Sequence, residues 1–153
     1  MQHFPIFLDL DGKTVVVSGG GEAALAKLRL LLKTTAFIQV FAEDPAPEIH
    51  AWARSHRLKL HQRPLTTQDM VGATLVYGAD EDSVRDAAIA SGAREVGVLF
   101  NIVDNLQESA FITPAIVDRD PVTVAIGTEG AAPVLARRIK ADLEARLPSG
   151  LGL

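Results

Sequence analysis

The fold of this chain is decided by Val15-Val16-Val17-Ser18-Gly19-Gly20-Gly21-Glu22-Ala23-Ala24. A β-branched run ends at three glycines, and residues with helical spacing follow, as at the entrance of a dinucleotide-binding βαβ unit. In such a unit the first glycine permits a tight turn and the second lets backbone N–H groups approach a pyrophosphate. A small third residue, here Ala24, lets the helix pack on the strand. The stretch therefore predicts a nicotinamide or flavin nucleotide, with its phosphates at the helix N-terminus.

An acidic residue is expected about 20 positions later, where it would bind the adenosine ribose. Glu43 and Asp44 occupy that place, directly after a predicted strand over 37–41. Because a carboxylate accepts hydrogen bonds from ribose hydroxyls and repels a 2′-phosphate, this position favours NAD over NADP. Two plainer interpretations stay open: the glycines only make a tight turn, and the carboxylates only face solvent.

The rest of the first two thirds of the chain alternates predicted strands and helices. Asp80 is expected to cap the third helix and Gly92 to end it. This order predicts an α/β fold, a Rossmann-like doubly wound parallel sheet covered on both faces. The predicted strands span 4–10, 14–17, 37–41, 58–62, 75–77 and 96–100, and the predicted helices span 22–33, 48–55 and 81–91.

The pattern changes after Asp104. Strands are expected over 110–112 and 122–126, followed by a glycine-bracketed loop over 127–130 and a helix from Pro133 to about Arg146. We therefore divide the chain into an NAD-binding Rossmann domain over residues 1–113 and a small C-terminal βα extension over residues 114–153.

Composition excludes several classes of function. The 153 residues contain no cysteine, which excludes disulfides, thiolate metal sites and a cysteine nucleophile and fits a cytoplasmic protein. The net charge of −4, without a basic run, argues against nucleic-acid binding. Apolar runs fall far short of the ~20 residues that span a bilayer, and Met1–Pro5 lacks the pattern of a signal peptide. The four scattered histidines predict no resident metal site.

Polar residues follow the strand predicted over 96–100. Asn101 and Asp104 stand at its carboxyl end, where α/β sheets bind their ligands. Asp104 is the candidate catalytic group and Asn101 a candidate substrate contact. A turn or capping role is the alternative for both residues.

Six motifs together resemble a known family. Their order and spacing, from about His3 to Pro148, resemble the N-terminal module of sirohaem synthase, a precorrin-2 dehydrogenase and sirohydrochlorin ferrochelatase. The motifs are His3-x-Pro5-Ile6-Phe7, Val17-x-Gly19-Gly20-Gly21, Lys27 with Leu30-Leu31-Leu32, Asn101-Ile102-Val103-Asp104, Phe111-Ile112-x-Pro114-Ala115-Ile116 and Pro133-Val134-Leu135-Ala136-Arg137-Arg138-Ile139.

The resemblance implies that NAD⁺ oxidises precorrin-2 to sirohydrochlorin and that ferrous iron then enters the macrocycle. It implies that Asp104 serves both steps, since a carboxylate can accept protons in each. It also implies a homodimer, formed through the extension after Gln107. The implied nucleotide contacts are Gly19, Gly20, Gly21, Glu22, Ala23, Glu43 and Asp44, and the implied substrate contacts are Asn101, Thr128 and Gly130.

Some positions depart from the family pattern around the nucleotide and substrate cleft. Ala26, directly after Leu25, replaces an arginine behind the glycines, and Ala79 replaces a threonine. Arg85 replaces an asparagine, and Ala132 replaces a serine. The alternative function is therefore a catalytically degenerate regulatory Rossmann module that binds NAD or a tetrapyrrole.

Overall fold

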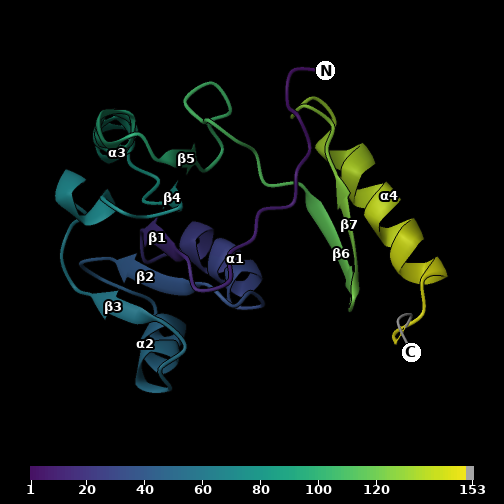
Figure 1. Ribbon diagram of the computed structural model, residues 1–153, viewed down its shortest axis with the longest axis horizontal. Helices are drawn as coiled ribbons and strands as arrows, with labels where there is room; N and C mark the ends of the chain where they lie inside the picture. The colour runs from purple at the N-terminus through teal and green to yellow at the C-terminus, as the bar shows by residue number, and fades with distance from the viewer. Residues whose placement is uncertain (151–153) are drawn as a thin grey trace. The chain divides into compact units, whose positions relative to one another are not determined.

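The computed structural model describes residues 1–150 (Figure 1). The chain folds into two compact units. One unit spans Ile6–Phe111, and the other combines Met1–Pro5 with the chain from Ile112 onward.

The larger unit contains a five-stranded parallel sheet in the order β3-β2-β1-β4-β5, which confirms the predicted Rossmann-like fold. The chain moves outward from β1 to β3, then returns to the other side of β1 for β4 and β5. Ligands of such sheets bind where the strand order reverses, at the carboxyl ends of β1 and β4. The strands are β1 (Thr14–Ser18), β2 (Phe37–Phe41), β3 (Lys59–His61), β4 (Leu75–Gly78) and β5 (Leu99–Ile102).

Helices cover both faces of this sheet. α1 (Glu22–Leu31) and α2 (Pro47–Arg54) lie on one face, where Val15 and Val17 of β1 pack among their side chains. The 3₁₀ helix η1 (Thr67–Met70) and α3 (Ser83–Val96) lie on the other face with Val16. Burial on both sides explains why β1 is apolar throughout instead of alternating.

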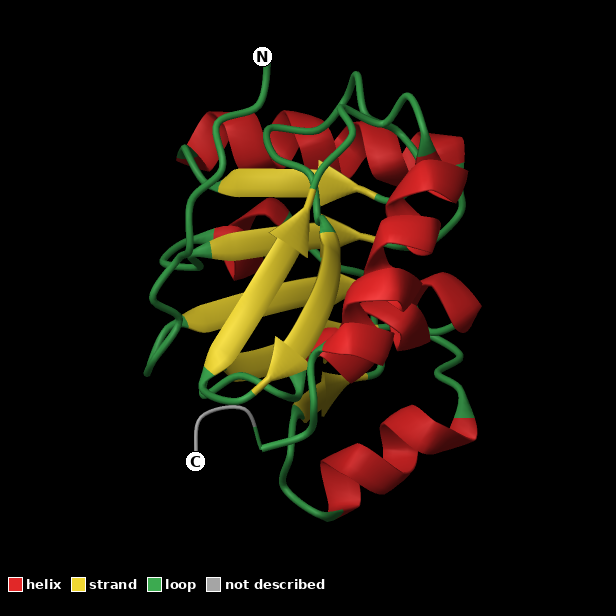
Figure 2. Cartoon of the chain, turned by 90° about the vertical axis from the view of Figure 1, so that its right-hand side faces the viewer, coloured by secondary structure: helices red, strands yellow, loops and turns green. Residues whose placement is uncertain are grey.

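The smaller unit is a hairpin with one helix. β6 (Ala115–Arg119) pairs antiparallel with β7 (Val122–Ile126); strands are drawn in yellow in Figure 2. α4 spans Pro133–Arg146 and begins with proline in its first turn. The Arg119 guanidinium donates hydrogen bonds to the carbonyls of Glu144 and Leu147, so the end of β6 holds the end of α4.

Two expected strands are absent from the described residues. Residues 4–10 form no strand, and Phe4 and Phe7 are exposed, because an apolar run becomes a strand only where a sheet edge pairs with it. Residues 110–112 are a loop, held where the Ala110 N–H donates to the Phe100 carbonyl. The hairpin strand begins later, at Ala115.

The ends of α3 also differ from the expectation. Asp82 caps the helix instead of Asp80, since its carboxylate accepts hydrogen bonds from the Val84 and Arg85 N–H groups. The helix continues through Gly92 and ends at Gly97, which adopts the left-handed conformation with φ of 75°. A Cβ on Gly92 would lie 2.6 Å from the Thr67 hydroxyl, so close packing against η1 explains that glycine.

Gly19 has the most constrained backbone of the glycine turn, which generates a stability prediction. Its φ is +130°, and an added Cβ would lie 2.3 Å from the Ala79 carbonyl oxygen. We expect Gly19→Ala to lower the free energy of unfolding by at least about 2 kcal/mol. Equilibrium urea unfolding, followed by Trp52 fluorescence, measures this loss.

Gly21→Ala is the matched control. Its φ is −99° and a Cβ there meets nothing within 4 Å, so we expect a loss below about 1 kcal/mol. Equal losses in the two variants would contradict the close approach at Gly19.

Candidate functional site

The N-terminus of α1 is open to a ligand. Gly21 is the N-cap residue, and no side chain caps the helix. The first N–H groups of a helix have no partner within it, and the helix dipole adds positive charge there. A Cβ on Gly21 would meet nothing within 4 Å, so the space beside this residue is open. Free N–H groups on an uncapped glycine turn suit an anion such as a pyrophosphate.

The glycine turn touches the loop that follows β2. A Cβ on Gly20 would lie 2.8 Å from the Pro45 Cα and 2.9 Å from the Asp44 carbonyl oxygen. The Ala46 N–H donates to the Gly20 carbonyl at 2.9 Å. The structure therefore brings the predicted phosphate turn next to the backbone of the segment that carries the predicted ribose-binding residues, as a dinucleotide requires.

Glu22 and Ala23 form the first turn of α1. The Glu22 carboxylate is exposed and pairs with Arg29 at 3.1 Å, so it is the backbone of Glu22 that borders the glycine turn. Ala23 is half-buried and packs against the core. Asp44 is exposed, and its backbone makes the close approach to Gly20.

Glu43 lies in a charged cluster that joins three elements. The Arg85 guanidinium, on α3, donates to Glu43 at 2.8 Å and lies 3.8 Å from the Asp80 carboxylate. The Ser18 hydroxyl, at the end of β1, donates to Asp80 at 2.6 Å. Burial raises the pKa of Asp80, while the Ser18 hydrogen bond and the Arg85 charge act against that rise. The sequence did not predict this cluster. Its one signal was Arg85, which stands where the resemblance implies an asparagine.

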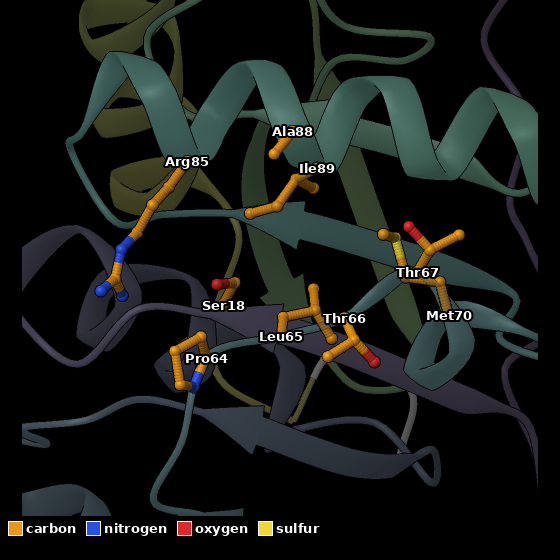
Figure 3. A pocket seen from close by; sticks show the side chains of 9 residues that line it. All are labelled: Ser18, Pro64, Leu65, Thr66, Thr67, Met70, Arg85, Ala88 and Ile89. Atoms are coloured by element: carbon orange, nitrogen blue, oxygen red, sulfur yellow. The ribbon is translucent and has the colours of Figure 1, made fainter.

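A pocket of about 190 Å³ opens beside Arg85 (Figure 3). It lies between α3 and the segment that leads into η1. Thr66 and Asp69 form a capping box there, and Arg63 holds Asp69 with two hydrogen bonds of 2.7 and 2.8 Å. These bonds keep the pKa of Asp69 far below its usual range. The lining includes Ser18, Leu65, Thr66, Met70, Arg85 and Ile89.

Asp104 follows β5 on a strained turn. Its φ is +62°, a left-handed conformation that aspartate tolerates better than most residues. Its side chain is exposed. The carboxyl ends of parallel strands share one edge of the sheet, so Asp104 lies on the same edge as the glycine turn. β4 separates β5 from β1, a spacing of about 10 Å.

Lys27 is a functional candidate that the sequence motif included without assigning a role. Its ammonium lies 5.9 Å from the centroid of the Tyr77 ring, which meets Phe111 edge-on. Burial lowers the pKa of Lys27, and the charge of Asp104 raises it. A half-buried cation therefore acts on the Asp104 carboxylate from α1.

Asn101 is buried, and its side chain already makes a hydrogen bond within the protein. Its side-chain amide donates to the Phe111 carbonyl at 2.9 Å. The Ser109 hydroxyl accepts from the Ile102 N–H and donates to the Asn105 carbonyl. These bonds fold the loop that carries Asp104, so the structure gives Asn101 a positioning role. Its predicted contact with substrate stays a prediction.

Thr128 and Gly130 belong to the smaller unit. The Thr128 carbonyl accepts from the Ala131 N–H at 3.0 Å, and Gly130 has φ of 73°, so both shape a turn. Between them Glu129 accepts hydrogen bonds from the Gln2 and His3 N–H groups and from the His3 ring. These bonds lower the pKa of Glu129. The sequence had not indicated this link between the N-terminus and the loop.

Two kinds of feature are absent from residues 1–150. No group of three or more histidine or acidic side chains there could hold a metal ion. No helix in that range has the length and apolarity needed to cross a membrane.

Comparisons with known proteins agree with this architecture. A family model described as "Putative NAD(P)-binding" matches residues 6–115, and one described as "Sirohaem biosynthesis protein central" matches residues 119–146. The chain is 41% identical to a "Siroheme synthase" of Chromobacterium violaceum and 40% identical to one of Photorhabdus laumondii. Each match covers 99% of this chain and 32% of the relative, so the chain spans about a third of their length.

A solved structure is also similar. The protein titled "SirC, precorrin-2 dehydrogenase" superposes with a TM-score of 0.79 at 27% identity. The match covers 95% of this chain and 72% of that protein.

Proposed function

Because the chain belongs to the NAD(P)-binding family that its residues 6–115 match, we propose that it is an NAD-dependent precorrin-2 dehydrogenase that produces sirohydrochlorin. The observation that carries this proposal is the position of Asp104, on the same sheet edge as an uncapped glycine turn. The similarity to siroheme synthases along 99% of the chain supports the choice of substrate.

The glycine turn and the loop after β2 would hold the cofactor. The backbone of Gly19, Gly20 and Gly21, with the first N–H groups of Glu22 and Ala23, would bind the pyrophosphate. The carboxylates of Glu43 and Asp44 would bind the ribose. When bound, NAD⁺ supplies the acceptor for a hydride.

Asp104 would carry the proton chemistry. Dehydrogenation removes a hydride and a proton from the tetrapyrrole, and the exposed Asp104 carboxylate would take the proton. The Asp104 charge also acts on the half-buried Lys27 ammonium, whose pKa it raises against the lowering effect of burial. Asn101 holds the loop. Thr128 and Gly130 are kept as proposed substrate contacts.

We extend the proposal to sirohydrochlorin ferrochelatase activity. When ferrous iron enters the macrocycle as a substrate, two pyrrole N–H protons must leave. The exposed Asp104 carboxylate would accept one proton, release it to solvent and then accept the second. The match of residues 119–146 to a sirohaem biosynthesis family supports this extension.

We also propose a homodimer, located in the cytoplasm. The helix α4 leaves Val134, Leu135 and Ile139 at 60%, 50% and 38% exposure. Leu135 and Ile139 stand four residues apart and line one shallow groove with Arg138, which gives the helix an apolar stripe for a second copy.

The cytoplasmic location rests on composition alone, since the chain has no cysteine.

Asp104→Asn tests the catalytic assignment. Asparagine has the same shape and tolerates the left-handed backbone, so folding is preserved while the proton acceptor is lost. We expect turnover of precorrin-2 with NAD⁺ to fall by at least about 100-fold. Calorimetry should show NAD⁺ affinity unchanged within about twofold, because Asp104 is not among the proposed nucleotide contacts.

Glu108→Gln, which removes an exposed carboxylate from the same loop, is the control and should retain turnover. Full activity in Asp104→Asn would refute the role of Asp104. A native protein that binds NAD⁺ but leaves precorrin-2 unchanged would favour the regulatory alternative.

Leu135→Arg tests the dimer. A charge in the centre of the apolar stripe should convert the dimer to monomer in sedimentation velocity. Val84→Arg, which changes a residue of α3 that is 78% exposed, should leave the dimer intact. If native protein and both variants sediment alike, α4 is not the dimer contact.

A further inference from the structure

Glu43 does not stand alone at the ribose position. We propose that Arg85 is a specificity-determining residue, which allows the adenosine end of the nucleotide site to accept NADP as well as NAD. The inference rests on the proposed nucleotide site and concerns the pairing of Arg85 with Glu43. A lone carboxylate would repel a 2′-phosphate, whereas a carboxylate paired with a guanidinium at 2.8 Å need not.

The pair is accessible to a ligand. The side chains of Glu43 and Arg85 are 56% and 40% exposed, whereas that of Asp80 is 7% exposed. Asp80 is held in place by the Ser18 hydroxyl and lies 3.8 Å behind the guanidinium. Glu43 can therefore exchange Arg85 for a ribose hydroxyl, while Asp80 keeps the arginine at this edge of the sheet.

The donor capacity of Arg85 suits a phosphate. A guanidinium has five N–H donors in one plane, a geometry that matches phosphate oxygens. Among the residues that the structure describes, the Arg85 guanidinium makes one hydrogen bond, to Glu43. Its position in the first turn of α3 is set by the Asp82 cap, which accepts from the Arg85 backbone N–H at 3.1 Å. The guanidinium thus has donors left for a second anion.

The charges around Arg85 also favour the binding of NADP. Without Arg85, Glu43 and Asp80 would present two carboxylates to a 2′-phosphate. With Arg85, one of these charges is offset, and the phosphate gains a direct partner. An asparagine at this position could do neither. Arginine at position 85 therefore weakens the discrimination against NADP that Glu43 would impose.

The neighbouring pocket fits the adjoining base. Arg85 stands at the rim of the 190 Å³ pocket, whose walls include the apolar side chains of Leu65, Met70 and Ile89 (Figure 3). Apolar walls beside a ribose carboxylate suit a flat aromatic base. The base and the 2′ position of one adenosine would then lie on either side of the arginine.

Calorimetric titration with NAD⁺ and NADP⁺ tests the proposal, with the ratio of the two dissociation constants as the readout. In the native protein we expect the two constants to agree within about tenfold. Arg85→Asn should raise the NADP⁺/NAD⁺ ratio at least about tenfold, through weaker NADP⁺ binding. Glu43→Gln should lower the ratio, because it removes the repelling charge and releases the guanidinium.

Arg94→Asn is the matched control, since Arg94 lies on the same helix and pairs with Glu108 at 3.0 Å. It should leave both constants unchanged. If Arg85→Asn binds NAD⁺ but leaves the ratio as it was, Arg85 has no role in specificity, while the proposed function stands. If the native protein binds neither nucleotide, both proposals fail.

Discussion

The close approach of Gly19 to Ala79 is the contact on which the binding edge of the sheet depends. The Ala79 N–H donates to the Ser18 carbonyl at 2.7 Å, and the Gly19 N–H donates to the Phe41 carbonyl at 2.9 Å. The end of β1 is thereby tied to β4 on one side and to β2 on the other. A side chain at position 19 would collide with the Ala79 backbone, so only glycine permits both bonds.

The close approach of Gly19 to Ala79 helps to bring the candidate functional residues to one edge of the sheet. The turn directs the uncapped end of α1 to the place where the strand order reverses. The ends of β1 and β4 also carry Ser18 and Asp80, which join the cluster with Arg85. The end of β5 carries Asp104 on a loop that Asn101 folds, and α1 brings Lys27 toward it. The proposed nucleotide recognition and the proposed proton transfer therefore depend on the same strand order.

Local signals were sufficient for most of the larger unit. The β-branched run of β1 and the proline in the first turn of α4 are local signals. The strand over Phe37–Phe41 and the helix over Pro133–Arg146 agree with the predicted bounds. Where the structure of a segment depends on a distant partner, the sequence was misleading. Residues 4–10 are apolar but find no sheet edge, and Gly92 looks like a helix end until η1 is seen to pack on it. Arg85 and Glu43 are 42 residues apart, so their pairing has no local signal.

The central claim is that the uncapped glycine turn binds the pyrophosphate, and amide NMR during titration with NAD⁺ tests it most directly. The account predicts saturable shifts that are largest at the N–H groups of Gly20, Gly21, Glu22 and Ala23, with smaller shifts at Glu43 and Arg85. Shifts that concentrate at the N-terminus of α2 or α3, with the glycine turn unchanged at saturation, would contradict it.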